Sequence, residues 1–375
     1  MPRVMKKRAA LGTTIQSKPG FCPNCDGRRI IKHGLRKNTH RQLQVYLCRD
    51  CGKFFSSLVG IKGVKYPPRV IARALCLYHL GHTQEEVAKR LDSDHRLTVP
   101  RRTIADWLAC YRPITTLYRL REASTEKFGK AMLKGRKLEH QQVYEFKMHL
   151  AKLDFLADAV PADVAAKVKN YLFSILEGFP DGLFQEDKTA NLDQATLAEG
   201  SAQRPESIRS SKSEFELLPF CRVQKENLAN DLAALGLLLA RKSRDRHPSV
   251  QDFMLANDSS TIACEVPIYL EADEIRYYKS KGFFVTLPES SKPITGHIDV
   301  IQARNGLIHI LDYKPDARHI DPVNQLVVYA LGLASRTRLP VKAFKCAWFD
   351  EKDYFEFFPL QAIQAKRAPR RPETL

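Results

Sequence analysis

The sequence predicts a multidomain protein in which a small β module and an all-α region precede an α/β domain with a mixed central sheet. Three observations lead to this prediction. Two Cys-x-x-Cys pairs flank short strand-like segments near the start of the chain, and helical periodicity follows them as far as residue 184. After residue 214 the pattern changes to a helix, strands, a helix and further strands. A length of 375 residues with 44% hydrophobic content is enough for two or three packed domains.

The positive charge of the chain is concentrated at one end. Residues 1–120 hold 24 Lys and Arg against 7 Asp and Glu, a net charge of +17, whereas residues 121–375 hold 36 against 35. A merely solvated surface would spread its charge more evenly. The distribution therefore predicts a polyanion-binding module, with nucleic acid as its partner, joined to a nearly neutral body.

Cysteine usage and hydropathy indicate a protein of the reduced cytoplasm. The nine cysteines are an odd number, and four of them form two close pairs, which fits metal binding better than a disulfide framework. The first residues are basic but lack the apolar core of a signal peptide. The longest apolar run, Leu232–Ala240, is too short to span a bilayer. We therefore expect no membrane partner.

The β module is expected over residues 18–60, where a glycine follows closely after each Cys-x-x-Cys pair. Two tight turns with this spacing supply two thiolates each to one tetrahedral Zn²⁺. The four expected ligands are Cys22, Cys25, Cys48 and Cys51. Because four ligands close the shell, this zinc would be structural rather than catalytic. Iron in the same cage and four buried thiols are the alternatives. The intervening segments "RRIIKHGLRK" and "RQLQVYLC" are expected as strands, with His33 and His40 facing solvent or phosphate.

Three short helices are predicted over residues 64–112. The first opens at Pro67-Pro68 and ends near Gly81, and a Thr-x-x-Glu capping box starts the second at Thr83. The third begins near Pro100. In a helix-turn-helix, this third helix would enter the major groove with three residues near its N-terminus: Arg101, Arg102 and Thr103. The connection "DSDHRLTV" is longer than the usual tight turn, and a small helical bundle is the alternative.

Together these two modules resemble the zinc-ribbon and helix-turn-helix heads of insertion-sequence transposases. The resemblance covers about the first third of the chain. It implies DNA binding, a prokaryotic or phage-encoded protein of the cytoplasm, and a link to a mobile element. A homo-oligomer and partner proteins encoded by the same element are both compatible with it.

A mainly helical middle region is expected over residues 113–184, from segments such as "HQQVYEFKMHLAKLDFLADAV" and "ADVAAKVKNYLFSILEGF". Such a region would space the two ends of the chain or form an oligomer contact. His140, Tyr144 and His149 are expected to be packing or surface residues without chemistry. Residues 185–213 are polar and small and contain no aromatic residue, which predicts a flexible linker.

A β-hairpin is the most informative feature of the α/β region, which is expected over residues 214–360. The segment Ile294–Pro315 reads as two alternating strands joined by Asn305-Gly306, the strongest short-range signal for a two-residue turn. With these two residues as the turn, Arg304 pairs with Leu307. Every further pair of opposite residues then follows from this register.

The register places two carboxylates opposite each other, those of Asp299 and Asp312. Like charges in such positions destabilise a sheet, but a divalent cation such as Mg²⁺ or Mn²⁺ between them would make the arrangement favourable. Lys314 projects from the same strand face, where it can contact a phosphate or an attacking water. Glu265 on the neighbouring predicted strand is a candidate third carboxylate. His297 is expected to be a strand residue at the edge of this site.

The order of Gly296, Asp299, the Asn-Gly turn, the Asp312-x-Lys314 pair and a following Gln-Tyr helix resembles the PD-(D/E)xK nuclease superfamily, and its RecB-type branch most closely. The resemblance covers roughly residues 220–358. It implies a restriction-endonuclease-like fold in which Asp299 and Asp312 hold the metal and Lys314 is catalytic. It also implies roles for three more residues: Gln325 and Tyr329 supporting the site or contacting DNA, and His247 as an upstream metal ligand.

These features predict a Mg²⁺-dependent DNA endonuclease that is positioned on DNA by its N-terminal modules. The sequence holds no phosphate-binding G-x-x-x-x-G-K-[ST] loop, so no ATP-driven movement is expected from this chain. Two alternatives stay open. One is a transposase or recombinase that uses three carboxylates, which would not need Lys314. The other is a DNA-binding regulator in which the nuclease fold is only a scaffold.

Overall fold

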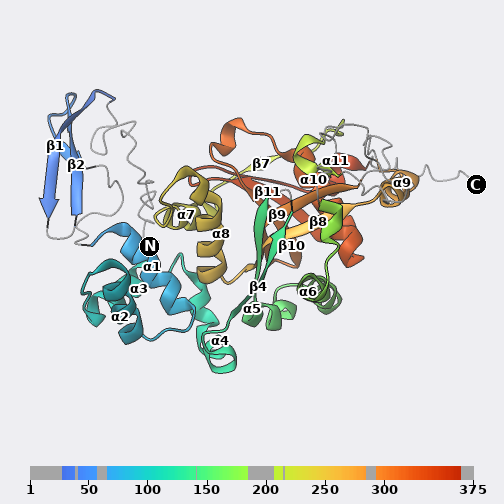
Figure 1. The fold of residues 1–375 in the computed structure, drawn as a ribbon. Helices are drawn as coiled ribbons and strands as arrows, with labels where there is room; N and C mark the ends of the chain where they lie inside the picture. The colour runs from blue at the N-terminus through green and yellow to red at the C-terminus, as the bar shows by residue number, and fades with distance from the viewer. Residues whose placement is uncertain are drawn as a thin grey trace, which may run out of the picture. The chain divides into compact units, whose positions relative to one another are not determined.

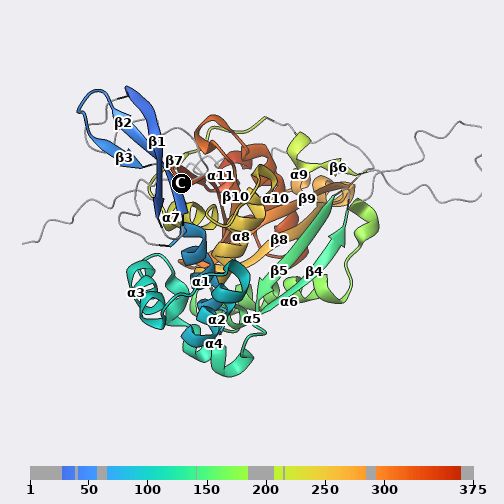
Figure 2. The same ribbon diagram turned by 60° about the vertical axis from the view of Figure 1, so that its left-hand side comes forward.

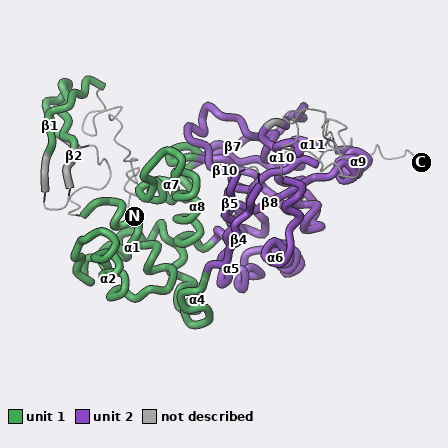
Figure 3. The backbone as a smooth tube through the Cα atoms, in the orientation of Figure 1, with its two compact units in different colours: residues 1–132, 226–259, 350–353 green, residues 133–225, 260–349, 354–375 purple. Residues whose placement is uncertain are grey.

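The computed structural model describes residues 28–38, 41–56, 66–140, 142–184, 207–213, 216–283 and 293–364. The chain divides into two compact units, shown in different colours in Figure 3. Unit 1 comprises residues 1–132, 226–259 and 350–353, and unit 2 comprises residues 133–225, 260–349 and 354–375. Each unit therefore contains segments that are distant in the sequence.

A small antiparallel sheet lies at the start of unit 1 (Figure 1). Its three strands are β1 (Ile30–Asn38), β2 (Arg41–Cys48) and β3 (Phe54–Ser56), paired in the order β1-β2-β3. Ile30, Tyr46 and Cys48 are its buried residues within the described part of this sheet. The two strands expected between the cysteine pairs are thus confirmed.

Three helices follow, as predicted from the sequence. They are α1 (Pro68–His79), α2 (Gln84–His95) and α3 (Arg101–Tyr111). Thr83 caps α2 and its Oγ1 accepts a hydrogen bond from the Glu86 N–H at 3.2 Å, so the predicted capping box is present. The helices pack through apolar side chains such as Leu75, Leu91 and Ile104, each of which is fully buried.

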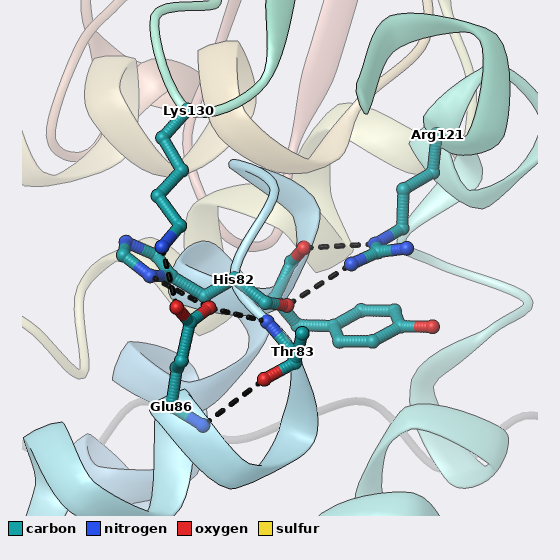
Figure 4. A network of polar contacts seen from close by, with 6 residues as sticks. His82, Thr83, Glu86, Arg121 and Lys130 are labelled. Carbon is teal, nitrogen blue, oxygen red and sulfur yellow. Dashed lines mark hydrogen bonds and ion pairs between the residues drawn. The ribbon is translucent and has the colours of Figure 1, made fainter. Parts of the chain in front are cut away.

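Polar contacts fix the turn between α1 and α2 (Figure 4). The Glu86 carboxylate accepts hydrogen bonds from the backbone N–H of Thr83 at 2.9 Å and from Lys130 Nζ at 2.5 Å. These bonds, with the bond to Lys130 as the larger cause, lower the pKa of Glu86 to about 2. Arg121 donates to the carbonyl oxygens of Tyr78 and His82, at 2.9 and 3.0 Å. The Arg121 side chain therefore links the last turn of α1 to the residue that precedes Thr83.

Unit 1 is completed by helices from two other parts of the chain. They are η1 (Thr116–Arg119), α4 (Arg121–Phe128), α7 (Leu228–Gly236), η6 (Ser243–Asp245) and α8 (Arg246–Asn257). Asn257 Oδ1 of α8 accepts a 2.8 Å hydrogen bond from Nδ1–H of buried His79 of α1. Residues 226–259 thus group with the predicted helix-turn-helix, whereas the sequence prediction placed them in a domain spanning residues 214–360.

A large mixed sheet forms the centre of unit 2, in agreement with the predicted α/β class. Its described strands follow the order β4-β5-β8-β9-β10-β11-β12-β7, and β6 pairs with β9. The strands are β4 (Leu133–Glu139), β5 (Val143–His149), β6 (Ile208–Arg209), β7 (Val223–Gln224), β8 (Thr261–Leu270), β9 (Ile294–Arg304), β10 (Leu307–Tyr313), β11 (Phe344–Phe349) and β12 (Tyr354–Phe357). The pairs β6–β9 and β10–β11 are parallel, and the other pairs are antiparallel.

Helix α10 packs against the middle of this sheet. It spans Val323–Thr337, as predicted, and a Cβ on its Gly332 would lie 2.9 Å from the Ile268 side chain of β8. This close approach explains the glycine. The other helical segments of unit 2 are α5 (Leu150–Asp154), η2 (Leu156–Asp158), α6 (Ala162–Glu177), η3 (Asp181–Phe184), η5 (Ser210–Lys212), α9 (Ala272–Ser280), η7 (Ala317–His319), η8 (Val341–Ala343) and α11 (Pro359–Ile363). Among the described residues, no helix is both long and apolar enough to cross a bilayer.

The prediction of a mainly helical middle region over residues 113–184 is wrong for its centre. Strands β4 and β5 form an antiparallel hairpin there, and β5 continues into the large sheet beside β8, as Figure 2 shows. Side chains of β5 alternate between buried and more exposed positions, with Phe146 and Met148 buried on one face. This period of two fits a strand better than a helix. The helical prediction holds for α6.

The predicted linker over residues 185–213 falls in two parts. Residues 185–206 lie outside the described residues. Residues 207–213 are structured: Ile208 and Arg209 pair with Ile294 and Thr295 of β9, and η5 follows directly. The end of the polar segment is therefore part of the unit 2 fold.

Candidate functional site

The hairpin of β9 and β10 has the predicted turn and register. Asn305 and Gly306 have φ values of 54° and 76°, which are the left-handed conformations of a type I′ turn. The ladder runs from the Arg304–Leu307 pair to the Val300–Leu311 pair. Asp299 follows directly, and its Oδ2 accepts a 2.9 Å hydrogen bond from the backbone N–H of Tyr313. The Asp299 carboxylate thus accepts the hydrogen bond of a strand N–H, a role that a backbone carbonyl has along the rest of the ladder.

The Asp312 carboxyl group is buried beside Asp299 and Lys314. Asp312 is 1% exposed, and Lys314 Nζ lies 2.8 Å from Asp312 Oδ2. Burial, followed by the charge of Asp299, raises the pKa of Asp312 to about 7. Burial acts to lower the pKa of Lys314, but the charges of Asp312 and Asp299 outweigh it and raise that pKa. The lysine is therefore held as an ammonium group next to two carboxyl groups that oppose each other's ionisation.

The site lies where β9 changes its neighbour. Ile294 and Thr295 pair with β6, and pairing with β10 begins only at Val300. Gly296 stands in this interval, where a Cβ would lie 2.5 Å from Ser210 Oγ and 2.6 Å from Tyr329 Cε1. Only glycine leaves room for the β6–η5 segment and α10 to meet there.

Gln325 and Tyr329 of α10 contact each other beside the carboxyl pair. Gln325 Nε2 donates a 2.6 Å hydrogen bond to the hydroxyl oxygen of Tyr329. Burial, together with the charges of Asp312 and Asp299, raises the pKa of Tyr329 well above its usual range. The Tyr329 ring is 3% exposed. It is thus a neutral phenol that packs behind the carboxyl groups.

Glu265 lies on β8 next to Asp299, because the flanking register pairs are Cys264–Val300 and Val266–Ile298. Its φ of 51° is left-handed, although it stands inside a strand. Such a conformation costs a residue with a Cβ about 1–2 kcal/mol. Strain of this kind is found most often at functional sites.

The pairing between β5 and β8 stops at this same level. Its recorded pairs are Lys147–Cys264 and Met148–Ala263. Beyond them, Glu265 has a left-handed backbone, and Pro267 has no N–H to donate. The β5 strand consequently separates from β8 where the candidate site begins.

Three residues for which the sequence predicts no chemistry lie beside this end of the β5–β8 pairing. The rings of Tyr144 and His297 stack with centroids 3.6 Å apart and an interplanar angle of 13°. His297 Nε2 lies 2.7 Å from Nδ1 of His140. The sequence predicts His140 and Tyr144 as packing or surface residues of a helical segment, whereas the structure has Tyr144 on strand β5 of the large sheet. The alternation along Val143–His149 was the signal that could have placed Tyr144 on a sheet.

The structure does not group every predicted residue with this site. Glu265, Asp299, Asp312, Lys314, Gln325 and Tyr329 belong to unit 2. His247 lies in α8, which belongs to unit 1. The role of His247 as an upstream metal ligand therefore stays a prediction.

The described half of the predicted zinc site has the form of a tight turn. Cys48 ends β2, and Gly52 N–H donates to its carbonyl oxygen at 2.9 Å, with Gly52 at a φ of 68°. The Cys48 N–H in turn donates to the Lys53 carbonyl at 3.1 Å. Cys51 lies within this turn, partly exposed. Cys22 and Cys25 lie outside the described residues, as does His40, and His33 is exposed as expected.

The predicted DNA-contacting residues lie at the N-terminus of α3. Arg101 and Arg102 are exposed and Thr103 is partly buried, whereas Ile104 and Trp107 face the helical core. Arg101 forms a 2.8 Å ion pair with Glu85 of α2. Because exposed ion pairs contribute only about 0–1 kcal/mol, this contact leaves the guanidinium available to a phosphate.

The chemistry of the Asp299–Asp312 pair fits a hard divalent cation. The charge of Asp299 raises the pKa of the buried Asp312 carboxyl group, so a positive charge shared by the two groups would stabilise them. Mg²⁺ takes few protein ligands and completes its shell with water and phosphate. Within the part of the chain that the structure describes, no three His, Cys, Asp or Glu side chains form a preassembled metal cage. Comparison with family models, with curated proteins and with solved structures found no match.

Proposed function

We propose that this protein is a Mg²⁺- or Mn²⁺-dependent DNA endonuclease that hydrolyses phosphodiester bonds. The observation that supports this most is the junction of Asp299, Asp312 and Lys314 at the end of the β9–β10 hairpin, with a 2.8 Å ion pair between the last two. The resemblance of these residues to the PD-(D/E)xK motif, of the RecB type, points to the same reaction. A structural role alone does not explain two adjacent acids of which one, Asp312, is buried.

In this proposal Asp299 and Asp312 hold the cation, with Glu265 as a third carboxylate beside them. The bound cation would polarise the phosphate and lower the pKa of a water molecule. Lys314 stays protonated next to the carboxylates and donates hydrogen bonds to the phosphate oxygens as negative charge develops there. Gln325 and Tyr329 support the site from helix α10, and their 2.6 Å hydrogen bond fixes the position of both side chains.

In this proposal the N-terminal modules bind the DNA. A structural zinc at Cys22, Cys25, Cys48 and Cys51 would lock the small sheet. The start of α3 would contact the major groove through Arg101, Arg102 and Thr103. The other basic residues of positions 1–120 would bind phosphates of the DNA backbone. The resemblance to transposase heads suggests that the protein serves a mobile element or phage.

Incubation of the purified full chain with supercoiled plasmid and Mg²⁺ tests the proposal. We expect nicking that EDTA and Asp312→Ala both abolish. Asp316→Ala is the matched control, since Asp316 is an exposed acid outside the site. Lys314→Ala should also abolish nicking, whereas full activity of this variant would favour a carboxylate-only transposase. DNA binding without nicking, unchanged in Asp312→Ala, would instead identify a non-catalytic regulator.

A further inference from the structure

A row of side chains crosses the sheet of unit 2 at one level. In the β8–β9 register His297 pairs with Pro267. Glu265 is opposite Asp299, because the pairs on either side are Cys264–Val300 and Val266–Ile298. Tyr144 of β5 reaches this level from the other side of β8, because its ring stacks on His297 at 3.6 Å. Three strands thus bring an aromatic hydroxyl to the level of the carboxylates.

A partly buried chain of polar contacts fixes the two stacked rings. Asp181 Oδ1 lies 3.1 Å from His140 Nε2, and His140 Nδ1 lies 2.7 Å from His297 Nε2. Arg136 donates to Asp181 Oδ2 at 2.6 Å and to the Ile175 carbonyl at 2.9 Å, which fixes the Asp181 carboxylate in place. The His140 side chain is 1% exposed and also stacks on Phe184, with ring centroids 4.0 Å apart.

This chain determines which ring nitrogens carry protons. A carboxylate only accepts, so His140 Nε2 must donate to Asp181. The neutral His140 then has a bare Nδ1, which accepts from the Nε2–H of His297. Burial lowers the pKa of both imidazoles, which favours the neutral forms. His297 is therefore held in one tautomer and one orientation, with Tyr144 against its face.

The surroundings of Tyr144 are those of a hydrogen-bond donor to an anion. Burial and then the charge of Glu265 raise the pKa of its hydroxyl, and Asp299 adds to this. Arg209 acts in the opposite sense on the same hydroxyl, so a guanidinium also lies nearby. Arg209 pairs with Thr295 of β9, on the strand face shared by His297 and Asp299. The Tyr144 phenol is therefore protonated and feels the charges of Glu265, Asp299 and Arg209.

We propose that Tyr144 is a further residue of the reaction site, whose hydroxyl donates a hydrogen bond to the scissile phosphate. We further propose that the chain His297–His140–Asp181–Arg136 positions its ring. This inference rests on the proposed nuclease function. The substrate phosphate then has donors on two sides, from Lys314 just after β10 and from Tyr144 of β5. Neither His140 nor Asp181 touches the substrate in this arrangement; both act through the stacked pair.

The test is Tyr144→Phe, which removes one oxygen and keeps the ring and its stacking. Loss of a hydrogen bond to a charged group corresponds to a fall in kcat of about 10- to 100-fold in the Mg²⁺-dependent cleavage of DNA. We expect DNA affinity in Ca²⁺, measured by fluorescence anisotropy, to stay within about twofold. Tyr277→Phe is the control, because Tyr277 is an exposed tyrosine of α9. A Tyr144→Phe variant that cleaves at the wild-type rate would overturn the inference while leaving the nuclease proposal intact.

A double-mutant cycle tests the positioning role. His140→Asn should lower kcat in the wild type, but by less than about threefold when Tyr144 is already phenylalanine, since coupled residues are not additive. An equal loss in both backgrounds would show that His140 does not act through Tyr144.

A readout independent of cleavage covers the case in which the wild-type protein proves inactive. The ¹⁹F resonance of 3-fluorotyrosine at position 144, assigned by its absence in Tyr144→Phe, should shift when DNA is added in Ca²⁺. The shift should be lost in His140→Asn. A resonance that DNA leaves unchanged would refute the placement of Tyr144 at the phosphate, whatever the activity.

Discussion

The left-handed backbone of Glu265 leads to a prediction with an unusual sign. Inside a regular strand, glycine is about 0.5–1 kcal/mol less favourable than alanine, because the unfolded chain gains entropy. At a left-handed position, however, every residue with a Cβ costs about 1–2 kcal/mol that glycine does not. With a φ of 51° at Glu265, Glu265→Gly should therefore be more stable than Glu265→Ala by about 0.5–1 kcal/mol.

Comparing these two variants isolates the backbone effect. Both remove the carboxylate and every contact that it makes, so only the presence of Cβ differs between them. The free energy of unfolding is measured by urea titration, with a difference in Tm of about 1–4 °C expected for a unit of this size. Both variants should lose Mg²⁺-dependent cleavage to the same extent, since both lack the third carboxylate.

Glu145 provides the matched control. It is an exposed glutamate on the neighbouring strand β5, and it is absent from the positive-φ residues among those described. At this position Glu145→Gly should be less stable than Glu145→Ala, which is the ordinary order. If the glycine variant is also the less stable one at position 265, then Glu265 carries no backbone strain and the reasoning fails.

Three more predictions follow from the same region and from the basic head. Gly296→Ala should lower the free energy of unfolding by about 1–3 kcal/mol, measured by urea titration, because its Cβ would lie 2.5 Å from Ser210 Oγ; an unchanged midpoint would contradict the close packing. The cation-free protein should lose stability as the pH rises from about 4 to about 7, since the native state keeps a proton on Asp312 that the unfolded state, with a pKa of 3.8, has released. Asp312→Asn should flatten that part of a thermal-unfolding pH profile, and an equal slope in both proteins would refute the assignment. DNA affinity should fall steeply with salt, and Arg102→Gln should make the slope of log K against log [salt] shallower by about 1; a slope unaffected by the substitution would remove Arg102 from the phosphate contacts.

Local patterns predicted those parts of the fold whose partners are close in sequence. The β9–β10 hairpin follows from a two-residue turn, and its register follows from counting outward from Asn305 and Gly306. The capping box at Thr83 and the helix that carries Gln325 and Tyr329 are equally local. In each case the residues that specify the element lie within it, so the sequence alone is sufficient.

The missed elements depend on partners that are far away in the chain. The alternation of β5 is ambiguous by itself, and its strand form is fixed by pairing with β8 more than a hundred residues later. The two residues of β6 have no strand pattern of their own and are ordered by β9. The hydrogen bond between His140 and His297 joins residues 157 positions apart. No window of sequence contains both members of such a contact.

The interruptions of regular structure in unit 2 occur together at the candidate site, and this explains how a buried sheet can hold reactive groups. Glu265 is left-handed, Pro267 lacks an N–H, and Gly296 lacks a side chain, all on adjacent strands near one level. A regular ladder there would fill the space with paired backbone and alternating apolar side chains. The irregular positions are flanked by fully buried apolar residues such as Val266, Ile298 and Val300, which hold the strands in place despite the strain. At Glu265, where the irregularity is a strained backbone, Glu265→Gly should therefore relieve the strain and remove activity together, because the carboxylate that it deletes belongs to the proposed site.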